Sequence, residues 1–316
     1  MEDATGINNS YTRREATKLI AAAGASAFLP GALESTAAPT TMLLRKIPAS
    51  GEELPVVGLG TWQTFDVSPS ATVRAPLKEV LQQFVQMGGK LIDSSPMYGE
   101  SEVVVGDLAA ELKVASKLFM ATKVWIQGRE AGITQMETSM QEMRSNPMDL
   151  MQIHNLVDWQ THLKTLRAWK EAKRIRYIGI THYTVSAFDK LEKIMQSEPI
   201  DFVQLNYNIA TRQAANRLLP LAQDKNIAVI VNRPFESGSL FSAVKNKPLP
   251  DWAREFDCAS WGQFFLKYIL GHPAITCVIP ATSKVKHLTD NMQAGYGRLP
   301  NAAQRSQMEQ FIQNLI

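Results

Sequence analysis

Short apolar runs alternate with longer amphipathic segments from residue 43 onward. Each run is almost continuously hydrophobic, and a polar loop separates it from the amphipathic segment that follows. Strands of this kind, joined through helices, are typical of a parallel sheet that is covered on its outer face. The predicted strands are Val56–Leu59, Lys90–Asp93, Phe119–Val124, Leu150–His154, Tyr177–Ile180, Phe202–Leu205, Ala228–Val231 and Ile275–Ile279.

The amphipathic segments have the spacing of α-helices, with apolar positions three or four residues apart. They are Leu77–Met87, Glu102–Leu112, Leu163–Ala172, Val185–Met195, Arg217–Gln223, Trp261–Leu270, Val285–Met292 and, near the C-terminus, Ala302–Leu315. Eight strand-and-helix units in about 240 residues favour a closed barrel over an open sheet. We therefore predict an α/β fold, a single (β/α)₈ TIM barrel with a C-terminal helix.

Two short apolar segments precede the first predicted helix. Leu43–Ile47 and Leu54–Val57 flank Ala49-Ser50-Gly51, and Gly51 is suited to a turn. The pattern predicts an N-terminal β-hairpin at the bottom of the barrel. No linker-like or low-complexity stretch interrupts residues 39–316, so we expect one barrel domain there.

The first 38 residues have a different composition. Arg13 and Arg14 precede an apolar, alanine-rich run from Leu19 to Leu29, and Pro30 and small residues follow it. A charged segment, a short apolar segment and a small-residue region are the parts of an export signal. The arginine pair resembles that of a bacterial twin-arginine (Tat) signal. An amphipathic N-terminal helix or a misassigned start is the alternative.

We expect residues 1–38 to act as a Tat-like export signal that is cleaved near Ala37 or Ala38. The apolar run is too short to remain as a membrane-spanning helix, so we expect no membrane association of the mature form. The export partner would be the Tat machinery, and the mature protein would be periplasmic or otherwise exported. If the signal does not function, the protein would stay cytoplasmic.

Charge and composition narrow the class of protein. The formal net charge is +3 and no dense Lys/Arg run occurs, so we expect no nucleic-acid partner. Cys258 and Cys277 have no metal-ligand spacing, and we expect two buried thiols, with a disulfide between them as the alternative. The histidines form no HxH pattern or carboxylate-rich ligand set. This argues against a metal-dependent hydrolase and predicts no metal.

Polar residues close three successive predicted strands. Asp93, Lys123 and His154 each end an apolar run, and Tyr98 lies five residues past the first of them. Taken singly, such an Asp is usually a helix cap and such a Tyr a packed ring, but a Lys that closes a buried strand needs a partner for its charge. Because barrel enzymes carry their active sites at the C-terminal ends of the strands, we expect the four side chains to meet.

The four side chains suit one kind of chemistry, the reduction of a carbonyl group. As hydride reaches the carbon, the oxygen needs a proton, and a phenol with a pKa near 10 transfers it slowly unless that pKa is tuned. The Lys123 ammonium would stabilise the Tyr98 phenolate, and Asp93 would hold the ammonium charged and in place. His154 would hydrogen-bond and orient the substrate carbonyl.

Four sequence blocks resemble the aldo-keto reductase family in order and spacing. They are GLGTW at 58–62, LIDSSPMYGESEVVVGDL at 91–108, ATKVW at 121–125 and QIH at 152–154. The resemblance extends over residues 43–293. It implies Tyr98 as the proton donor, Lys123 and Asp93 as its tuning partners, and His154 as the group that orients the substrate.

A further block, IPATSKVKHLTDNM at 279–292, resembles the family's segment for the adenosine end of NADP(H). The residues that this implies are Ser283 and Lys284 at the 2′-phosphate, and Asp290 and Asn291 at the adenine. The N-terminus of the following helix would add its dipole. His287 stands where the family often has Arg, which leaves NADH open beside NADPH/NADP+ as the cofactor.

The nicotinamide end departs from the family pattern in two places. Gln204 corresponds to a residue that binds the nicotinamide amide, but Thr181-His182 replaces the usual Ser-Asn that contacts the same amide. Asn232 stands where many members stack a tyrosine on the nicotinamide ring. Arg233, which follows it, is expected to contact the pyrophosphate.

Three aromatic residues lie in strand-end loops near the four polar ones. Trp62, Phe65 and Trp125 would form an apolar entrance for the substrate, or else be rings packed in the loop layer. We expect NADP(H)-dependent reduction of a small aldehyde or ketone to an alcohol, or the reverse reaction. The second hypothesis is a redox-sensing or regulatory barrel that holds the nucleotide and turns over very slowly.

Overall fold

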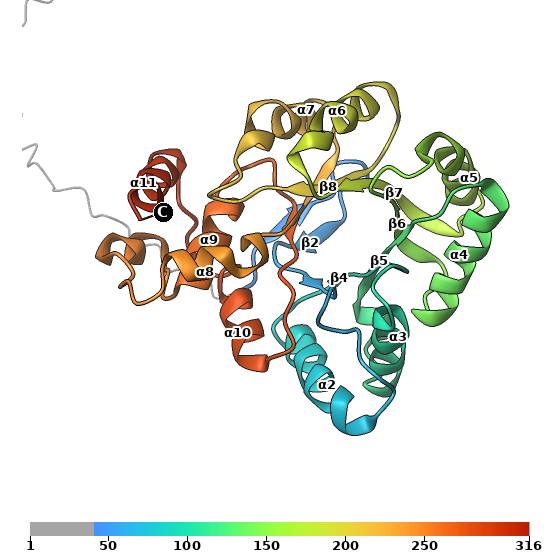
Figure 1. Cartoon of the computed structure of the whole chain (residues 1–316), viewed down its shortest axis with the longest axis horizontal. Coiled ribbons are helices and arrows are strands. Elements are labelled where there is room, and N and C mark those ends of the chain that lie inside the picture. Colours follow the sequence, from blue (N-terminus) through green and yellow to red (C-terminus); the bar gives the residue numbers. More distant parts are fainter. Residues whose placement is uncertain (1–40, 316) are drawn as a thin grey trace, which may run out of the picture. The chain divides into compact units, whose positions relative to one another are not determined.

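The computed structural model describes residues 41–315, and the predicted export signal lies outside them. A ring of parallel strands forms the centre, and helices surround it (Figure 1). The strands are β3 Leu59–Gly60, β4 Leu91–Asp93, β5 Phe119–Val124, β6 Met148–His154, β7 Ile175–His182, β8 Phe202–Asn206, β9 Ala228–Asn232 and β10 Cys277–Val278. They pair in sequence order from β3 to β10.

Bridges between the first and last strands close the ring. Val57 pairs with Val278 and Gly60 with Ala281, both in parallel register, and the Gly58 N–H donates to the Val278 carbonyl at 2.9 Å. The Cβ of any residue larger than glycine at position 58 would lie 2.8 Å from the Leu91 carbonyl oxygen, so the close approach requires glycine there. The predicted (β/α)₈ barrel is confirmed.

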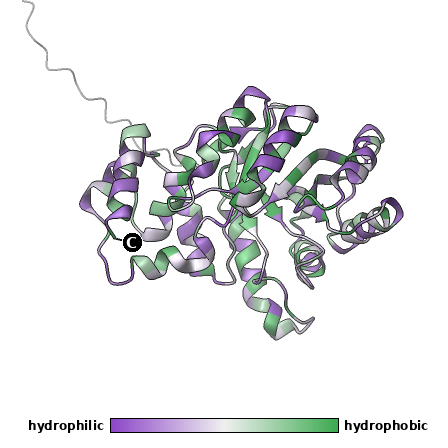
Figure 2. Ribbon diagram, turned by 45° about the horizontal axis from the view of Figure 1, so that its top comes forward, coloured by the Kyte–Doolittle hydropathy of each residue, from purple (hydrophilic) through white to green (hydrophobic). Residues whose placement is uncertain are grey.

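The helices present an apolar stripe to the strands and a polar face to solvent. In Figure 2 the central strands are mainly green, whereas the helices around them mix green and purple. The α-helices are α2 Ala71–Gln86, α3 Ser101–Glu111, α4 Arg129–Glu142, α5 Trp159–Glu171, α6 Phe188–Ser197, α7 Leu218–Asp224, α8 Ser239–Ala243, α9 Trp261–Leu270, α10 Val285–Gln293 and α11 Ala302–Gln313. Short 3₁₀ helices are η1 Ala115–Lys117, η2 Val185–Ala187, η3 Gln213–Asn216, η4 Glu236–Gly238 and η5 Asp251–Phe256.

Helices α4 and α2 are among those that differ from the sequence pattern. Helix α4 was not predicted, because its buried face carries Gly132, Ser139 and two methionines instead of a row of strongly apolar residues. Helix α2 begins before Pro76, whereas the pattern predicted a start after it. As the sixth residue of the helix, Pro76 lacks the N–H that would otherwise donate to the Thr72 carbonyl.

The predicted hairpin lies at the bottom of the barrel, the end at which the strands begin. Strands β1 (Leu44–Lys46) and β2 (Glu53–Pro55) pair antiparallel, with Leu44 opposite Pro55. Ile47 and Leu54 are buried and join a cluster of inward-facing residues of the barrel that includes Phe119 and Phe202. The hairpin therefore closes the bottom of the barrel with apolar side chains.

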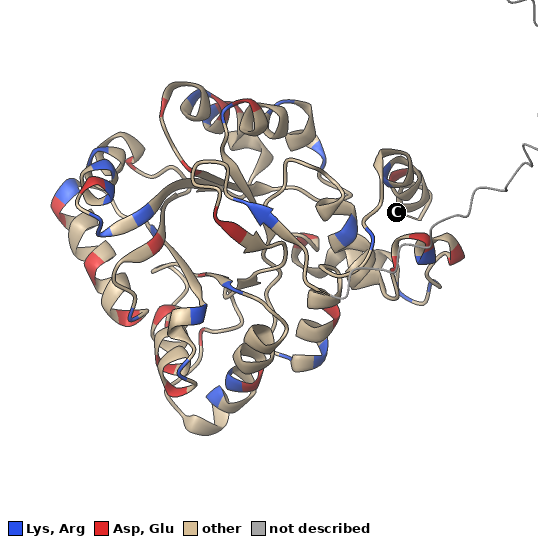
Figure 3. Ribbon diagram, turned by 180° about the vertical axis from the view of Figure 1, so that it is seen from behind, with Lys and Arg blue, Asp and Glu red and all other residues tan. Residues whose placement is uncertain are grey.

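The register of the strands brings polar residues to the opposite, upper end. Lys123 pairs with Gln152 across β5 and β6, and Thr181 pairs with Gln204 across β7 and β8. In Figure 3, Lys, Arg, Asp and Glu colour the helices more than the strands. Both cysteines are buried free thiols, as predicted, and form no disulfide. Within residues 41–315, no helix has the length and hydrophobicity needed to cross a membrane.

Candidate active site

A buried ion pair lies at the upper end of the barrel. The Lys123 Nζ is 2.6 Å from Asp93 Oδ2 and 2.6 Å from the Ser94 carbonyl oxygen, and the side chains are 0% and 3% exposed. Burial lowers the pKa of Lys123, but Asp93 and Tyr98 raise it more, so the pKa lies above its ordinary value. The lysine therefore stays charged inside the protein.

Two glutamine amides complete the surroundings of Asp93. Its Oδ1 accepts hydrogen bonds from Gln152 Nε2 at 2.9 Å and from Gln204 Nε2 at 2.8 Å. The Gln204 Nε2 also lies 3.1 Å from Gln152 Oε1. The two carboxylate oxygens thus accept hydrogen bonds from Lys123, Gln152 and Gln204, which lie on three different strands. These bonds hold Asp93 in one orientation. Gln152 was not predicted as a site residue, although a polar residue inside an apolar strand was a signal for it.

Tyr98 lies beside this pair in the loop after β4. The Lys123 Nζ is 5.0 Å from the centre of the phenol ring. Burial raises the pKa of Tyr98, the Lys123 charge lowers it and Asp93 raises it, and the net effect is a pKa above 10.0. Tyr98 is therefore a protonated phenol at neutral pH, next to a cation that stabilises its conjugate base.

His154 ends β6 on the other side of Tyr98. Their ring centres are 5.7 Å apart and the rings are nearly perpendicular, at 86°. Burial, the Lys123 charge and His182 lower the pKa of His154 to about 2. The imidazole is therefore neutral, with one N–H donor and one acceptor nitrogen. Ser95 Oγ, which sequence reasoning did not single out, lies 2.9 Å from His154 Nδ1.

A second buried acid, Glu102, lies just outside the barrel at the start of α3. It accepts hydrogen bonds from Thr122 Oγ1 and, at 3.0 Å, from Ser139 Oγ. Burial raises its pKa, and although these hydrogen bonds lower it, the pKa reaches about 7. Glu102 thus joins β5, which carries Lys123, to α3 and α4. Within residues 41–315 it forms no ion pair.

The residues predicted at the nicotinamide end gather around Gln204. Its Oε1 accepts from Thr181 Oγ1 at 3.2 Å and from Asn232 Nδ2 at 3.4 Å. His182 accepts a hydrogen bond from the Thr184 N–H at Nδ1 and stacks on Tyr183, with ring centres 5.7 Å apart. Through these hydrogen bonds Gln204 links Asp93 to the ends of β7 and β9.

Arg233 is held by an acid in the loop after β9. Its Nη2 lies 2.9 Å from Glu236 Oε2, and Glu236 Oε1 accepts from Asn208 Nδ2 at 2.8 Å and Thr211 Oγ1 at 2.6 Å. Burial raises the pKa of Glu236, but these hydrogen bonds, together with one from Asn206, lower it to about 2. Glu236, another residue that the sequence did not indicate, thus fixes Arg233 at the mouth of the barrel.

The residues predicted at the adenosine end lie just before α10 and along it. Ser283 is half-buried, and Lys284 and His287 are exposed. Asp290 is already engaged, since its carboxylate oxygens accept from Ser260 Oγ at 2.7 Å and Gln263 Nε2 at 2.8 Å. Asn291 is buried. This end of the site therefore presents the exposed Lys284 side chain, while Asp290 links α10 to α9.

The aromatic residues divide into two groups. Trp62 is 44% exposed and Trp125 is 41% exposed, and the Trp125 ring centre lies 6.3 Å from that of His154. Phe65 is fully buried and belongs to the hydrophobic core, so the alternative of a packed ring describes it. Met97, 38% exposed, lies next to Tyr98 and adds an apolar group that the prediction omitted.

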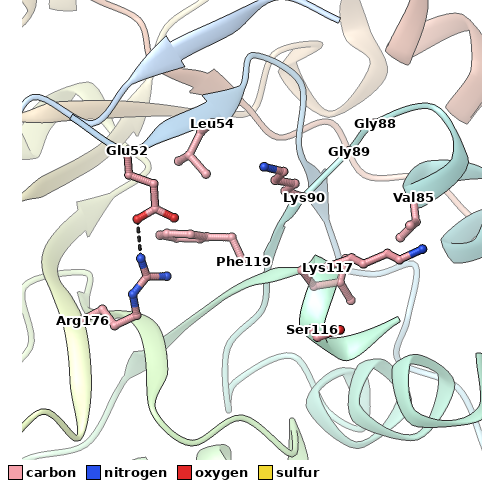
Figure 4. Close-up of a pocket in the computed structure, with 11 residues that line it drawn as sticks. Glu52, Leu54, Val85, Gly88, Gly89, Lys90, Ser116, Lys117, Phe119 and Arg176 are labelled. Atoms are coloured by element: carbon pink, nitrogen blue, oxygen red, sulfur yellow. Dashed lines mark hydrogen bonds and ion pairs between the residues drawn. The ribbon is translucent and has the colours of Figure 1, made fainter. Parts of the chain in front are cut away.

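Two open cavities lie at the other end of the barrel. One, of about 390 Å³, is lined by residues that include Lys90, Phe119 and Arg176 (Figure 4). The other, of about 450 Å³, shares Arg176 as part of its wall. The lining residues of both cavities lie at the starts of strands, in the hairpin and at the ends of the helices that precede strands, and they do not include the group around Lys123.

Similarity to known proteins agrees with this geometry. Residues 56–311 match the model of the aldo/keto reductase family. Methylglyoxal reductase YeaE of Escherichia coli (strain K12) is 24% identical over 259 residues, which are 79% of this chain and 89% of that protein. Aldo-keto reductase YhdN of Bacillus subtilis (strain 168) is 25% identical over 200 residues, which are 58% of this chain and 60% of that protein. A crystal structure of an aldo-keto reductase from Klebsiella pneumoniae in complex with NADPH matches with a TM-score of 0.71 at 20% identity, covering 86% of this chain and 96% of that one.

Proposed function

This chain belongs to the aldo/keto reductase family, and we propose that it catalyses the NADP(H)-dependent reduction of an aldehyde or ketone to an alcohol, or the reverse. The observation that carries the proposal is the buried Asp93–Lys123 pair, with the lysine Nζ 5.0 Å from the centre of the Tyr98 ring. A protonated phenol beside a fixed cation is a proton donor suited to a carbonyl oxygen. The Escherichia coli relative, a methylglyoxal reductase, acts on such a substrate by its name.

The division of labour follows from the surroundings of each group. The bound cofactor would supply hydride to the carbonyl carbon. Tyr98 would give its proton to the carbonyl oxygen, and Lys123 stabilises the phenolate that remains. Asp93 keeps the lysine charged and in place. Neutral His154 would hydrogen-bond the carbonyl oxygen and orient it.

Two buried atoms at the end of β9 fit a dinucleotide. Asn232 Oδ1 and Arg233 Nε are both buried and have no hydrogen-bond partner within residues 41–315. An amide oxygen suits the N–H groups of the nicotinamide carboxamide, and a guanidinium N–H suits the pyrophosphate. At the other end, Ser283 and Lys284 would hold the 2′-phosphate, which favours NADPH, while His287 in place of the family's usual Arg leaves NADH as the alternative. The Klebsiella pneumoniae structure contains NADPH in a barrel of the same fold.

The rim of the site favours substrates with an apolar group next to the carbonyl. The large apolar side chains exposed in the loops that follow β3, β4 and β5 are Trp62, Met97, Trp125 and Ile126. Their surface would be covered by an apolar substituent of the substrate, with a gain of about 25 cal/mol for each Å² removed from water.

The substitution Tyr98→Phe tests the proposal. It removes the proton donor and keeps the ring, so NADPH oxidation with a panel of aldehydes and ketones should fall about 10²- to 10⁴-fold. NADPH binding, followed by fluorescence titration, should stay unchanged. The matched control is Tyr296→Phe, which removes a phenol that donates to the Met87 carbonyl oxygen at 2.7 Å, remote from the site. Equal activity of Tyr98→Phe and wild type would overturn the assignment of the proton donor.

The same panel separates this function from that of a nucleotide-holding regulatory barrel. In that case the wild-type protein would bind NADPH tightly and reduce none of the substrates at a measurable rate. The buried Asp93–Lys123 pair favours the reductase, since a barrel that only holds nucleotide has no need of a charged lysine beside a phenol.

The export of the protein is a separate proposal. The arginine pair, the apolar run and the small residues within residues 1–38 support a Tat-like signal. Tat substrates are exported folded, so the protein would acquire its cofactor before export. Changing Arg13-Arg14 to Lys-Lys in a tagged full-length chain should retain the protein in the cytoplasm. Equal fractions outside the cytoplasm for the variant and the wild type would contradict the proposal.

A further inference from the structure

A serine hydroxyl faces the inner nitrogen of His154. Ser95 Oγ lies 2.9 Å from His154 Nδ1, and both residues are buried. The serine belongs to the loop after β4 and the histidine ends β6, so the contact exists because the barrel brings two distant segments together. Ser95 Oγ is the hydrogen-bond partner of the imidazole within residues 41–315.

The surroundings of the hydroxyl favour one direction for this hydrogen bond. The Met97 N–H donates to Ser95 Oγ at 3.3 Å, so the serine oxygen already accepts a backbone hydrogen bond. Its own proton has the Nδ1 lone pair within reach. A neutral imidazole has one protonated and one bare nitrogen, and a donor at Nδ1 selects the form with the proton on Nε2.

We propose that Ser95 is a positioning residue that fixes the tautomer of His154, so that Nε2–H points its proton toward the substrate carbonyl oxygen. The inference rests on the proposed reductase function and deepens it. In the opposite tautomer Nδ1–H would donate to Ser95, and the bare Nε2 would face the carbonyl oxygen. Two acceptors would then meet, and His154 could stabilise no charge on the oxygen.

Because its pKa is low, His154 is neutral, and the position of its single ring proton decides which nitrogen can donate a hydrogen bond. Burial, Lys123 and His182 keep the ring neutral over the working pH range, so the imidazole has one proton to place. A doubly protonated ring would donate from both nitrogens whatever Ser95 does. In the neutral ring, the donor at Nδ1 determines whether the other nitrogen can donate.

Nitrogen NMR of the wild-type protein, labelled with ¹⁵N-histidine, reads the tautomer directly. The His154 signals are identified by their loss in His154→Asn. We expect a protonated Nε2 and a bare Nδ1 in the wild type, and a mixture or a reversal in Ser95→Ala. A protonated Nδ1 in the wild type would overturn the proposal, and so would an unchanged tautomer in Ser95→Ala. The wild-type spectrum is informative even if a variant fails to fold or the protein reduces no carbonyl compound, so failure of the proposed function is seen separately.

Kinetics provide the second readout. Because one hydrogen bond that biases the tautomer is worth up to about tenfold, kcat/KM for the carbonyl substrate should fall about tenfold in Ser95→Ala, with the Kd for NADPH unchanged. Ser95→Thr keeps the hydroxyl and should recover most of the loss. The matched control is Ser101→Ala, whose buried hydroxyl has no partner within the described residues. An equal loss in both alanine variants would show a merely structural effect and overturn the proposal.

Discussion

The two ends of the barrel each contain an ion pair, and the two pairs differ in almost every other respect. At the upper end Lys123 and Asp93 are 0% and 3% exposed. At the bottom Arg176 contacts Glu52 of the hairpin loop and, at 2.5 Å, Asp149, with its own side chain 40% exposed (Figure 4). A cation paired with a carboxylate thus lies in nearly dry protein at one end of the barrel and at the edge of solvent at the other.

The difference teaches what a buried pair is for. Taking two charges out of water costs several kcal/mol for each ion, and their attraction repays this cost only where every lone pair and proton is matched. Around Asp93 the match is made by Gln152 and Gln204. An apolar pair would stabilise the fold as well or better, so the charges at the upper end are explained by chemistry. The bottom pair needs less explanation, since the Arg176 and Glu52 side chains are 40% and 33% exposed and remain in contact with water.

Removing the cation of the buried pair should have the largest effect. Lys123→Met leaves Asp93 charged in the interior, and we expect the free energy of unfolding to fall by about 3–5 kcal/mol. Carbonyl reduction should fall at least about 100-fold, since Tyr98 loses the cation beside it. Urea denaturation and NADPH oxidation measure the two losses. The double variant Asp93→Asn with Lys123→Met should recover stability but not activity, and recovery of neither would contradict the comparison.

Glu102 tests burial without an ion pair. Its folded-state pKa of about 7 lies above the ordinary 4.5, so the folded protein binds this proton more tightly than the unfolded chain. Its contribution to stability is fully present below pH 4.5 and is lost as the pH rises to 7. We expect wild-type stability to fall by roughly 3 kcal/mol over this window. In Glu102→Gln this part of the fall should vanish, and a parallel pH profile for variant and wild type would refute the prediction.

Removing the amide of Gln152, one of the two that support Asp93, should reduce stability and activity less than removing the Lys123 cation. Gln152→Met keeps the volume and removes one donor to the carboxylate, and hydrogen bonds to charged groups contribute about 2 kcal/mol. We expect a loss of stability of that size in urea denaturation, with activity reduced less than in Lys123→Met. An effect as large as that of Lys123→Met would show that the amide, not the cation, holds Asp93.

The exposed pair should be the least sensitive. Arg176→Met removes the charge at the bottom and keeps part of the stem that packs near Phe119, with the guanidinium carbon 5.9 Å from the ring centre in the wild type. Exposed pairs such as Arg176–Glu52 contribute about 1 kcal/mol or less. Asp149, 14% exposed, also loses its cation, so we expect the free energy of unfolding to fall by about 1–2 kcal/mol, less than in Lys123→Met. Activity should be unaffected. A loss of several kcal/mol would erase the distinction between the two ends.

The barrel could be predicted from the sequence because its strands are continuous apolar runs bounded by polar loops. For the same reason it indicated Asp93, Lys123 and His154, each of which interrupts that pattern at a strand end. Helix α4 escaped because its buried face is made of glycine, serine and methionine, which resemble a polar segment. Phe65 was expected at an entrance or in the loop layer, and only the packing of the loop decides that it joins the core.

The supporting residues were harder to predict than the residues they support. Ser95 and Gln152 meet His154 and Asp93 across 59 residues of sequence. Their role depends on strand register and on the direction in which each side chain points, and neither is encoded in local periodicity. Glu236 was hidden in a different way, because it lies in an irregular loop in which it, Arg233 and Ser237 all have positive φ. Such a backbone has no repeating pattern for the sequence to display.

The hairpin at the bottom closes one of the two ends by which a ligand could enter the barrel. With Ile47 and Leu54 filling one end, any molecule that reaches Lys123 enters and departs by the single mouth at the other. A reaction between two ligands in such a dead end has an order: the molecule seated deeper arrives first and departs last. In the proposed reaction, the order in which ligands bind and leave would therefore depend on the apolar cluster at the end of the barrel opposite the chemistry.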